Sequence, residues 1–157
     1  MIELVMAILV LSIGILAIVA AFGSGTLAIH RASRVATAAS LADVQMERYR
    51  ALRYDSIMLD SGSVSSADTI PSYANDTARI PPQFTGTCPS LPRECQASQS
   101  VTGADGGSYR VDTYITIQAA TTTYRENKLV TIVVREVVTD PPKTLIRVPS
   151  TFDQATG

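Results

Sequence analysis

The side chains in this sequence that could do chemistry are few and lie far apart. Glu3 stands at the edge of a long apolar run, Cys88 and Cys95 are its two cysteines, and Asp105 lies in a glycine-rich stretch. The chain has a single histidine, the residue that most often serves acid–base chemistry at neutral pH. The sequence contains no pattern of nucleophile and base, no phosphate-binding loop and no set of metal ligands. We therefore predict that the protein is not an enzyme and uses no cofactor.

Glu3 is the only charged side chain before His30, and the 26 residues between them carry no charge. A carboxylate at the centre of a bilayer costs about 2.5–3.5 kcal/mol, and residues that bear such a cost usually have a functional partner. The partial positive charge of a helix N-terminus lowers the cost. Two interpretations follow: Glu3 pairs with a cationic partner, or it lies at the membrane surface and has no role.

Cys88 and Cys95 are seven residues apart and flank the segment PSLPRE. Both follow the apolar run, on the side of a membrane where oxidation is possible. A disulfide would constrain a segment that has few apolar residues of its own. A metal site is the alternative, but it needs four ligands, and neither histidine nor further cysteine lies nearby. The sequence therefore favours a disulfide between Cys88 and Cys95.

Asp105, in the stretch TGADGGS, also has two interpretations. A carboxylate and loop carbonyls together can hold calcium, whereas an Asp-Gly pair commonly forms a plain turn. We favour the turn, keep Asp105 as a candidate calcium ligand, and predict no metal site. The formal net charge of −1 and the scattered arginines give no indication of a nucleic-acid site.

The element that must position Glu3 is the apolar run, which we assign to residues 1–30. A bilayer core of about 30 Å needs roughly 20 helical residues, and this run exceeds that length. A signal peptide has a shorter apolar region after a basic leader, and a buried core helix would need a second apolar segment to cover it. Arg31 and Arg34 follow the run, which places the rest of the chain inside unless a basic leader preceded the run at insertion. We predict a transmembrane or filament-core half-helix.

The helical pattern continues past this run, so we predict one helix from Ile2 to about Arg53. Apolar residues recur there at spacings of three and four, namely Val35, Ala38, Ala39, Ala42, Met46, Tyr49 and Leu52. Gly14, Gly23 and Gly25 weaken the helix, each by about 1 kcal/mol relative to alanine. We expect an intact helix in the membrane, where unpaired backbone groups are costly. When such helices pack together, we predict a kinked or unwound stretch between Gly14 and Gly25.

The remainder of the chain is predicted to contain a loop region, a sheet and a tail. Residues 54–107 are rich in serine, threonine, proline and glycine and have little apolar periodicity, residues 108–149 alternate as three antiparallel strands, and residues 150–157 form a tail. A sheet with one apolar face needs a partner, and the amphipathic helix at 31–53 provides one. The predicted fold class is α+β, a pilin-like arrangement with a projecting apolar half-helix and a head at 31–157 in which the amphipathic half packs on a small β-meander.

The start of the chain resembles the type IV pilin and pseudopilin family. In that family the mature chain begins with an aromatic residue and threonine, followed by an aliphatic pair, glutamate and an apolar helix. Met1, Ile2 and Glu3 match the aliphatic pair and the glutamate, and LVMAILVLSIGILAIVAAF follows, whereas the aromatic–threonine pair is missing. The spacing from Glu3 to Gly14, with ATAASLADVQMERYRALRYDSI downstream, is more similar to minor pilins and secretion pseudopilins than to major pilins.

The resemblance implies a structural subunit that polymerises with itself and with other pilins through the apolar helix. Glu3 would neutralise the amino terminus of a neighbouring subunit. The precursor would lie in the inner membrane and the product in an extracellular or periplasmic filament serving motility, adhesion, DNA uptake or secretion. Implied partners are a prepilin peptidase, an assembly ATPase and a platform protein. The alternatives are a minor pseudopilin of a type II secretion or DNA-uptake machine and, from another class, a single-pass membrane-anchored binding module.

Overall fold

The computed structural model describes residues 2–88, 91–120, 125–138 and 141–154. The chain divides into two compact units, Met1–Arg34 and Val35–Gly157. Met1 of the predicted aliphatic pair and residues 155–157 of the predicted tail lie outside the described residues.

Helix α1 runs from Ile2 to Arg50 and contributes to both units. It ends three residues before the predicted Arg53. At that end the amide of Leu52 bonds to the carbonyl of Tyr49 rather than to that of Arg48, and Arg53 has extended backbone, with φ −68° and ψ 148°. The predicted apolar stripe is buried at Ala38, Ala42, Met46 and Tyr49, together with Gln45, whereas Val35 is exposed.

The second unit contains a four-stranded antiparallel sheet, and the fold class is α+β as predicted. The strand order is β3 (Ser98–Thr102), β4 (Ser108–Gln118), β5 (Asn127–Glu136) and β6 (Lys143–Asp153). Strand β3 was missed because serine and glutamine occupy most of its positions and hide the alternation. Strand β6 continues to Asp153, so residues 150–153, which we predicted to be part of the tail, belong to the sheet.

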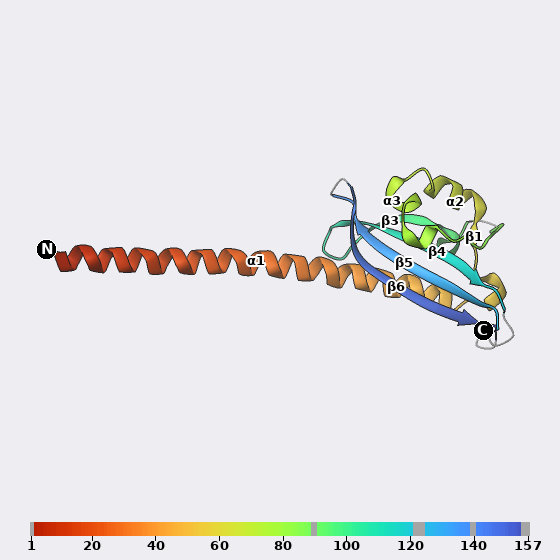
Figure 1. The fold of residues 1–157 in the computed structure, drawn as a ribbon, viewed down its shortest axis with the longest axis horizontal. Coiled ribbons are helices and arrows are strands. Elements are labelled where there is room, and N and C mark those ends of the chain that lie inside the picture. Colours follow the sequence, from red (N-terminus) through yellow and green to blue (C-terminus); the bar gives the residue numbers. More distant parts are fainter. Residues whose placement is uncertain (1, 89–90, 121–124, 139–140, 155–157) are drawn as a thin grey trace. The chain divides into compact units, whose positions relative to one another are not determined.

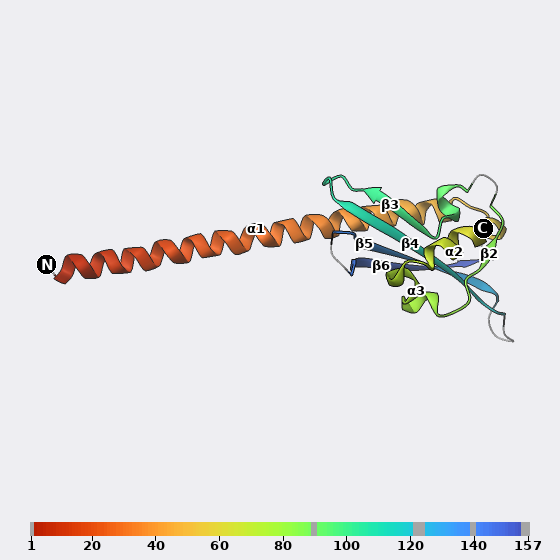
Figure 2. The same ribbon diagram turned by 90° about the horizontal axis from the view of Figure 1, so that it is seen from above.

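One face of this sheet forms the main core with the second half of α1. Because cross-strand partners share a face, Val111, Thr113 and Ile115 lie beside Val134, Ile132 and Val130. All six are buried, and the five apolar ones form one cluster with Ala38, Ala42, Met46 and Tyr49 of α1. Figures 1 and 2 show this part of α1 running along the sheet, as the alternation of the strands predicts.

The opposite face is covered too, which the sequence analysis did not predict. Residues 54–97 are not the irregular loop that we expected. They contain η1 (Tyr54–Ser56), β1 (Leu59–Asp60), α2 (Ser61–Ala67), α3 (Pro71–Ala74), η2 (Thr77–Arg79), β2 (Thr85–Gly86) and η3 (Arg93–Cys95). Each element is too short to produce a periodic pattern, but side-chain caps define the starts of α2 and η2. The Asp60 carboxylate accepts from the amide of Ser63 at 2.9 Å, and Asp76 accepts from the amide of Ala78 at 2.9 Å.

Candidate functional site

Glu3 lies in the first turn of α1, and its side chain is exposed. Every large apolar side chain from Ile2 to Ile29 is also at least half exposed. In the part of the chain that the structure describes, α1 is the one helix long and apolar enough to cross a membrane. Residues 2–29 therefore present an apolar surface on all sides with a single carboxylate near its start, and water is a poor solvent for it.

The three predicted weak points lie inside the continuous helix. A methyl group added to Gly14, Gly23 or Gly25 would meet no other atom within 4 Å, so no contact within the single chain requires glycine there. Hydroxyls compete for nearby backbone carbonyls: Ser24 donates to Ala21 at 2.9 Å and Thr26 donates to Gly23 at 2.9 Å. The segment from Gly23 to Thr26 thus combines low helix propensity with alternative partners for its carbonyls.

Cys88 and Cys95 form the predicted disulfide, with their Cα atoms 6.3 Å apart. The end of this loop is held against α1. The Gln45 amide donates to the carbonyl of Arg93 at 3.3 Å, and the Tyr49 hydroxyl donates to the carbonyl of Glu94. Burial raises the pKa of the Tyr49 hydroxyl, which keeps it protonated as this hydrogen bond requires. The disulfide closes a loop that attaches to the helix mainly through backbone carbonyls.

Asp105 lies in the turn between β3 and β4. Its carboxylate accepts hydrogen bonds from the amide of Gly107 at 3.0 Å and from the hydroxyl of Tyr109. Gly106 has φ +75°, the left-handed conformation that glycine adopts easily, and its amide bonds to the carbonyl of Gly103 at 3.0 Å. This is the Asp-Gly turn that we favoured. Among the described residues no group of three or more histidine, cysteine, aspartate or glutamate side chains gathers as metal ligands do.

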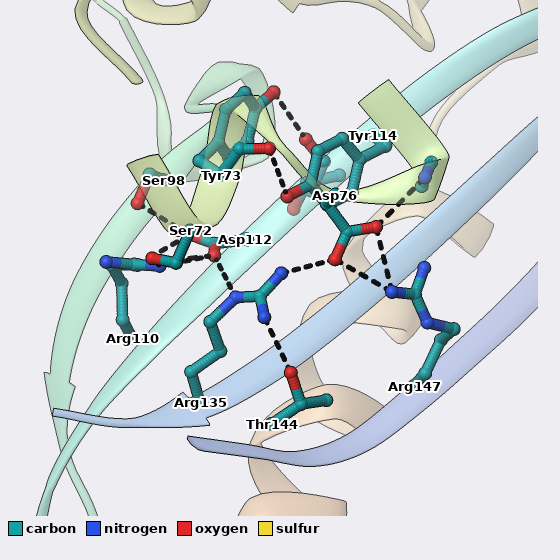
Figure 3. Close-up of polar contacts among 12 residues, drawn as sticks. Ser72, Tyr73, Asp76, Ser98, Arg110, Asp112, Tyr114, Arg135, Thr144 and Arg147 are labelled. Carbon is teal, nitrogen blue, oxygen red and sulfur yellow. Dashed lines mark hydrogen bonds and ion pairs between the residues drawn. The ribbon is translucent and has the colours of Figure 1, made fainter. Parts of the chain in front are cut away.

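The densest polar site is one that sequence reasoning missed, a cluster of three arginines and two aspartates on the second face of the sheet. We call it the arginine–aspartate cluster: Asp76, Arg110, Asp112, Arg135 and Arg147, shown in Figure 3. Its members come from the segment after α3 and from strands β4, β5 and β6. On each strand they alternate with core residues, so the sequence presents them as an ordinary exposed face.

Asp112 is fully buried and lies between two arginines. Its carboxylate accepts from Arg110 Nε at 2.9 Å, from Arg135 Nε at 2.8 Å and from the Ser98 hydroxyl at 2.7 Å. Arg110 also donates to the Ser72 hydroxyl at 2.5 Å. Two guanidinium groups therefore compensate the charge of Asp112, and the carboxylate joins β3, β4 and β5.

Asp76 holds the other end of the cluster. Arg135 donates to it through Nη2, and Arg147 Nη2 lies 2.8 and 2.7 Å from its two oxygens. Burial opposes the charged form of Asp76, but the hydrogen bonds from Arg147, the Ala78 amide and Arg135 outweigh this effect and hold its pKa below the ordinary value. A carboxylate that is ionised and fully bonded is a structural anchor rather than a general acid or base.

Two tyrosines complete this face. Tyr73 and Tyr114 stack with ring centroids 4.5 Å apart, and each hydroxyl donates to a backbone carbonyl at 3.2 Å, those of Thr113 and Tyr73 respectively. Burial raises the pKa of both hydroxyls. Both tyrosines therefore stay neutral at physiological pH and act in packing.

A buried lysine was also missed. Lys128 Nζ donates to the carbonyls of Tyr54 at 2.8 Å and Ile57 at 3.0 Å, and lies over the rings of Tyr54 and Phe84 at 4.4 and 4.2 Å. Burial lowers the pKa of Lys128, against the attraction of Asp55 and Glu126. The ammonium holds the turn after α1 to strand β5. A lone lysine in a strand gives no sequence signal for this arrangement.

Comparison with protein-family models, curated proteins and solved structures finds no match to this chain. Inferences about its function therefore depend on the residues and geometry described above.

Proposed function

We propose that this chain is a structural subunit of a type IV pilus-like filament and that it polymerises through its N-terminal apolar helix. The observation that carries the proposal is α1 itself. One continuous helix exposes apolar side chains on every side in its first part and buries a stripe beneath the sheet in its second part. A helix of this kind needs an apolar environment for one part and a folded head for the other.

Two environments satisfy the first part of α1, and a filament subunit uses both. Lipid covers the apolar side chains before assembly, and other copies of the same helix cover them afterwards. The transfer costs little because both environments are apolar. Glu3 then distinguishes the lipid environment from the helix bundle. A cationic partner in the bundle stabilises the carboxylate far more than lipid does.

A minor pseudopilin of a secretion or DNA-uptake machine is the closest alternative and would use the same helix in the same way. An anchored binding module is the alternative from another class, because one helix of this length and hydropathy is sufficient for a single membrane span. By resemblance to pilins, the filament proposal adds an inner-membrane precursor and, as partners, a prepilin peptidase, an assembly ATPase and a platform protein.

The deciding experiment is electron microscopy of material sheared from cells that make the protein, with mass spectrometry of the purified fibres. We expect fibres that contain this chain as the main component. A variant lacking residues 2–30 is the control and should yield none. A chain that is abundant in the membrane fraction of cells without fibres would contradict the filament proposal and favour the anchored module. A trace of this chain in fibres made mainly of another protein would favour the minor subunit.

A further inference from the structure

A small pocket lies on the second face of the sheet, beside the arginine–aspartate cluster. Its volume is about 220 Å³, below the range of about 300–1,000 Å³ that is usual for drug-sized ligands. Its walls come from β4, β5, β6 and the segment after α3, and they include Thr77, Tyr114, Thr116, Thr131, Arg147 and Pro149. A group the size of one sugar or one amino acid suits such a space.

Arg147 brings unused hydrogen-bonding capacity to this pocket. Only its Nη2 contacts Asp76, as Figure 3 shows, and within the part of the chain that the structure describes Nε and Nη1 have no partner. A guanidinium carries five N–H donors in a fixed fork, so one edge of this fork is still available. That edge can bind a planar anion through two parallel hydrogen bonds.

The charge balance favours an anion of a single charge. The arginine–aspartate cluster has three cations and two anions, an excess of one positive charge. The side chain of Arg147 is 38% exposed, whereas those of the other four members are at most 9% exposed, so the excess is accessible only at Arg147. Among the described residues, Arg147 is the one cation that lines the pocket. A carboxylate matches this single excess charge better than a phosphate monoester, which carries nearly two charges at neutral pH.

Two nearly buried hydroxyls line the same pocket as this cation. Thr116 and Thr131 are 9% and 7% exposed, and neither hydroxyl makes a hydrogen bond within the described residues. They share a face of neighbouring strands, since Tyr114 is opposite Thr131 and Thr116 is opposite Leu129. Hydroxyls that are partly removed from water and unpaired gain from a ligand that has hydroxyls of its own. Pro149, opposite Thr131 on β6, adds an apolar wall.

From this geometry we infer that the pocket binds an acidic sugar, with the sugar carboxylate on the free edge of Arg147 and its hydroxyls on Thr116 and Thr131. Thr77, an exposed residue, also lines the pocket and offers a further hydroxyl to the sugar. The inference concerns the second unit alone and does not depend on the filament proposal. Because the pocket is small, we expect an affinity in the millimolar range.

The test is a methyl NMR titration of the full chain in detergent with sodium glucuronate. Glucose, acetate and inorganic phosphate are the comparison ligands. We expect glucuronate to shift the methyl signals of Thr131 and Leu129, with glucose and acetate each at least about tenfold weaker, because each lacks one half of the recognised chemistry. Phosphate should not compete at equal concentration.

Variants locate the interaction. Arg147→Gln should weaken glucuronate binding by about tenfold or more, since it removes the charge-assisted pair. Thr131→Val keeps the shape and removes one hydroxyl, and it should weaken binding by about threefold or more even if Arg147→Gln does not fold. Arg50→Gln is the matched control, because Arg50 is also an exposed arginine paired with a carboxylate, at 2.5 Å from Glu47.

Several results would overturn the inference. One is that glucuronate at about 50 mM shifts no methyl signal. Another is that glucose or acetate reproduces the shifts at the same concentration. A third is that Thr131→Val leaves glucuronate binding unchanged. A loss of binding in Arg50→Gln would place the ligand near α1 and would equally overturn it.

Discussion

At the scale of single residues, Glu3 is the side chain on which the proposed assembly depends most. It is the only carboxylate in the first unit, and it lies in the first turn of α1. We predict that Glu3→Ala leaves the chain folded and inserted in the membrane but lowers fibre yield several-fold or more, because a cationic partner in the bundle loses its counter-charge. Fibre yield relative to the membrane-bound pool measures this effect.

Glu47→Ala is the control for Glu3, since it removes another exposed carboxylate from the same helix, one that pairs with Arg50 within α1. It should leave the yield unchanged. Fibre yield from Glu3→Ala equal to that of the unmodified chain would mean that the carboxylate is a surface residue without a role.

Asp76 is the residue whose charge matters most to the head. Asp76→Asn leaves Arg135 and Arg147 without their shared counter-charge, so we predict a loss of about 3–5 kcal/mol in the free energy of unfolding. Denaturant unfolding of the full chain in detergent measures this loss. Asp68→Asn is the matched control. Asp68 pairs with Arg79 at 2.7 Å where both side chains are partly exposed, and we expect a loss of about 1 kcal/mol or less.

The lowered pKa of Asp76 also predicts that the stability of the fold depends on pH. The pKa of Asp76 is lower in the folded chain than its ordinary value, so the unfolded chain binds more protons as the pH falls. The stabilisation is complete above the ordinary pKa of about 4 and is lost as the pH falls from there through the folded pKa. In Asp76→Asn the free energy of unfolding should therefore fall less steeply as the pH is lowered through this range. An equally steep fall in the variant would assign the acid sensitivity to other carboxylates.

At the scale of elements, the loop closed by Cys88 and Cys95 is attached to α1 by Gln45 and Tyr49. We predict that the protein isolated without reductant has no thiol that reacts with an alkylating agent, as mass spectrometry would show. Replacing both cysteines by serine should lower the free energy of unfolding by about 2–3 kcal/mol, because the short loop is no longer constrained in the unfolded chain. Two alkylated thiols in unreduced protein would contradict the disulfide.

The first part of α1 is the element for which the single chain and the assembled form should differ. The helix is continuous in the single chain. In a bundle, neighbouring helices shield freed carbonyls, so we predict a kinked or non-helical stretch between Gly14 and Gly25. A filament structure with unbroken helical hydrogen bonds from Leu4 to Arg50, where α1 ends in the single chain, would contradict this prediction.

A variant tests the same point without a filament structure. Alanine at Gly14, Gly23 and Gly25 meets no neighbouring atom in the single chain and favours the helix by about 1 kcal/mol per position. The variant should therefore insert normally and assemble less well. Unchanged fibre yield would show that assembly does not need the helix to kink or unwind between Gly14 and Gly25.

At the scale of the whole molecule, the two units have different requirements. The buried apolar cluster runs from Ala38 to Val134, with partly buried neighbours as far as Phe152, so the second unit contains a core of its own. We predict that residues 35–157 alone are soluble and monomeric, with one cooperative unfolding transition of about 5–10 kcal/mol. Size-exclusion chromatography and near-ultraviolet circular dichroism with denaturant test this. Aggregation or loss of the near-ultraviolet signal would mean that the first unit is needed for the head to fold.

The sequence by itself determined the features that depend on local pattern. The apolar run, the continuation of the helix to near Arg50, the alternation in β4 and β5, and the pairing of Cys88 with Cys95 all follow from residues close together in the chain. Helix and strand periodicities are properties of a few successive residues, and a disulfide across seven residues requires only a short loop. The turn at Asp105 belongs to the same group.

Only the tertiary structure decided what covers the second face of the sheet. Asp76, Asp112 and Arg135 are up to 59 residues apart, and Lys128 reaches carbonyls more than 70 residues away. In the sequence these side chains look like solvent-exposed polar positions between buried ones. Whether a polar face meets water or a matched set of opposite charges depends on where the short elements of residues 54–97 lie, and no local pattern carries that information. Charge pairing inside a fold is a property of distance in space, which the chain acquires only when it folds.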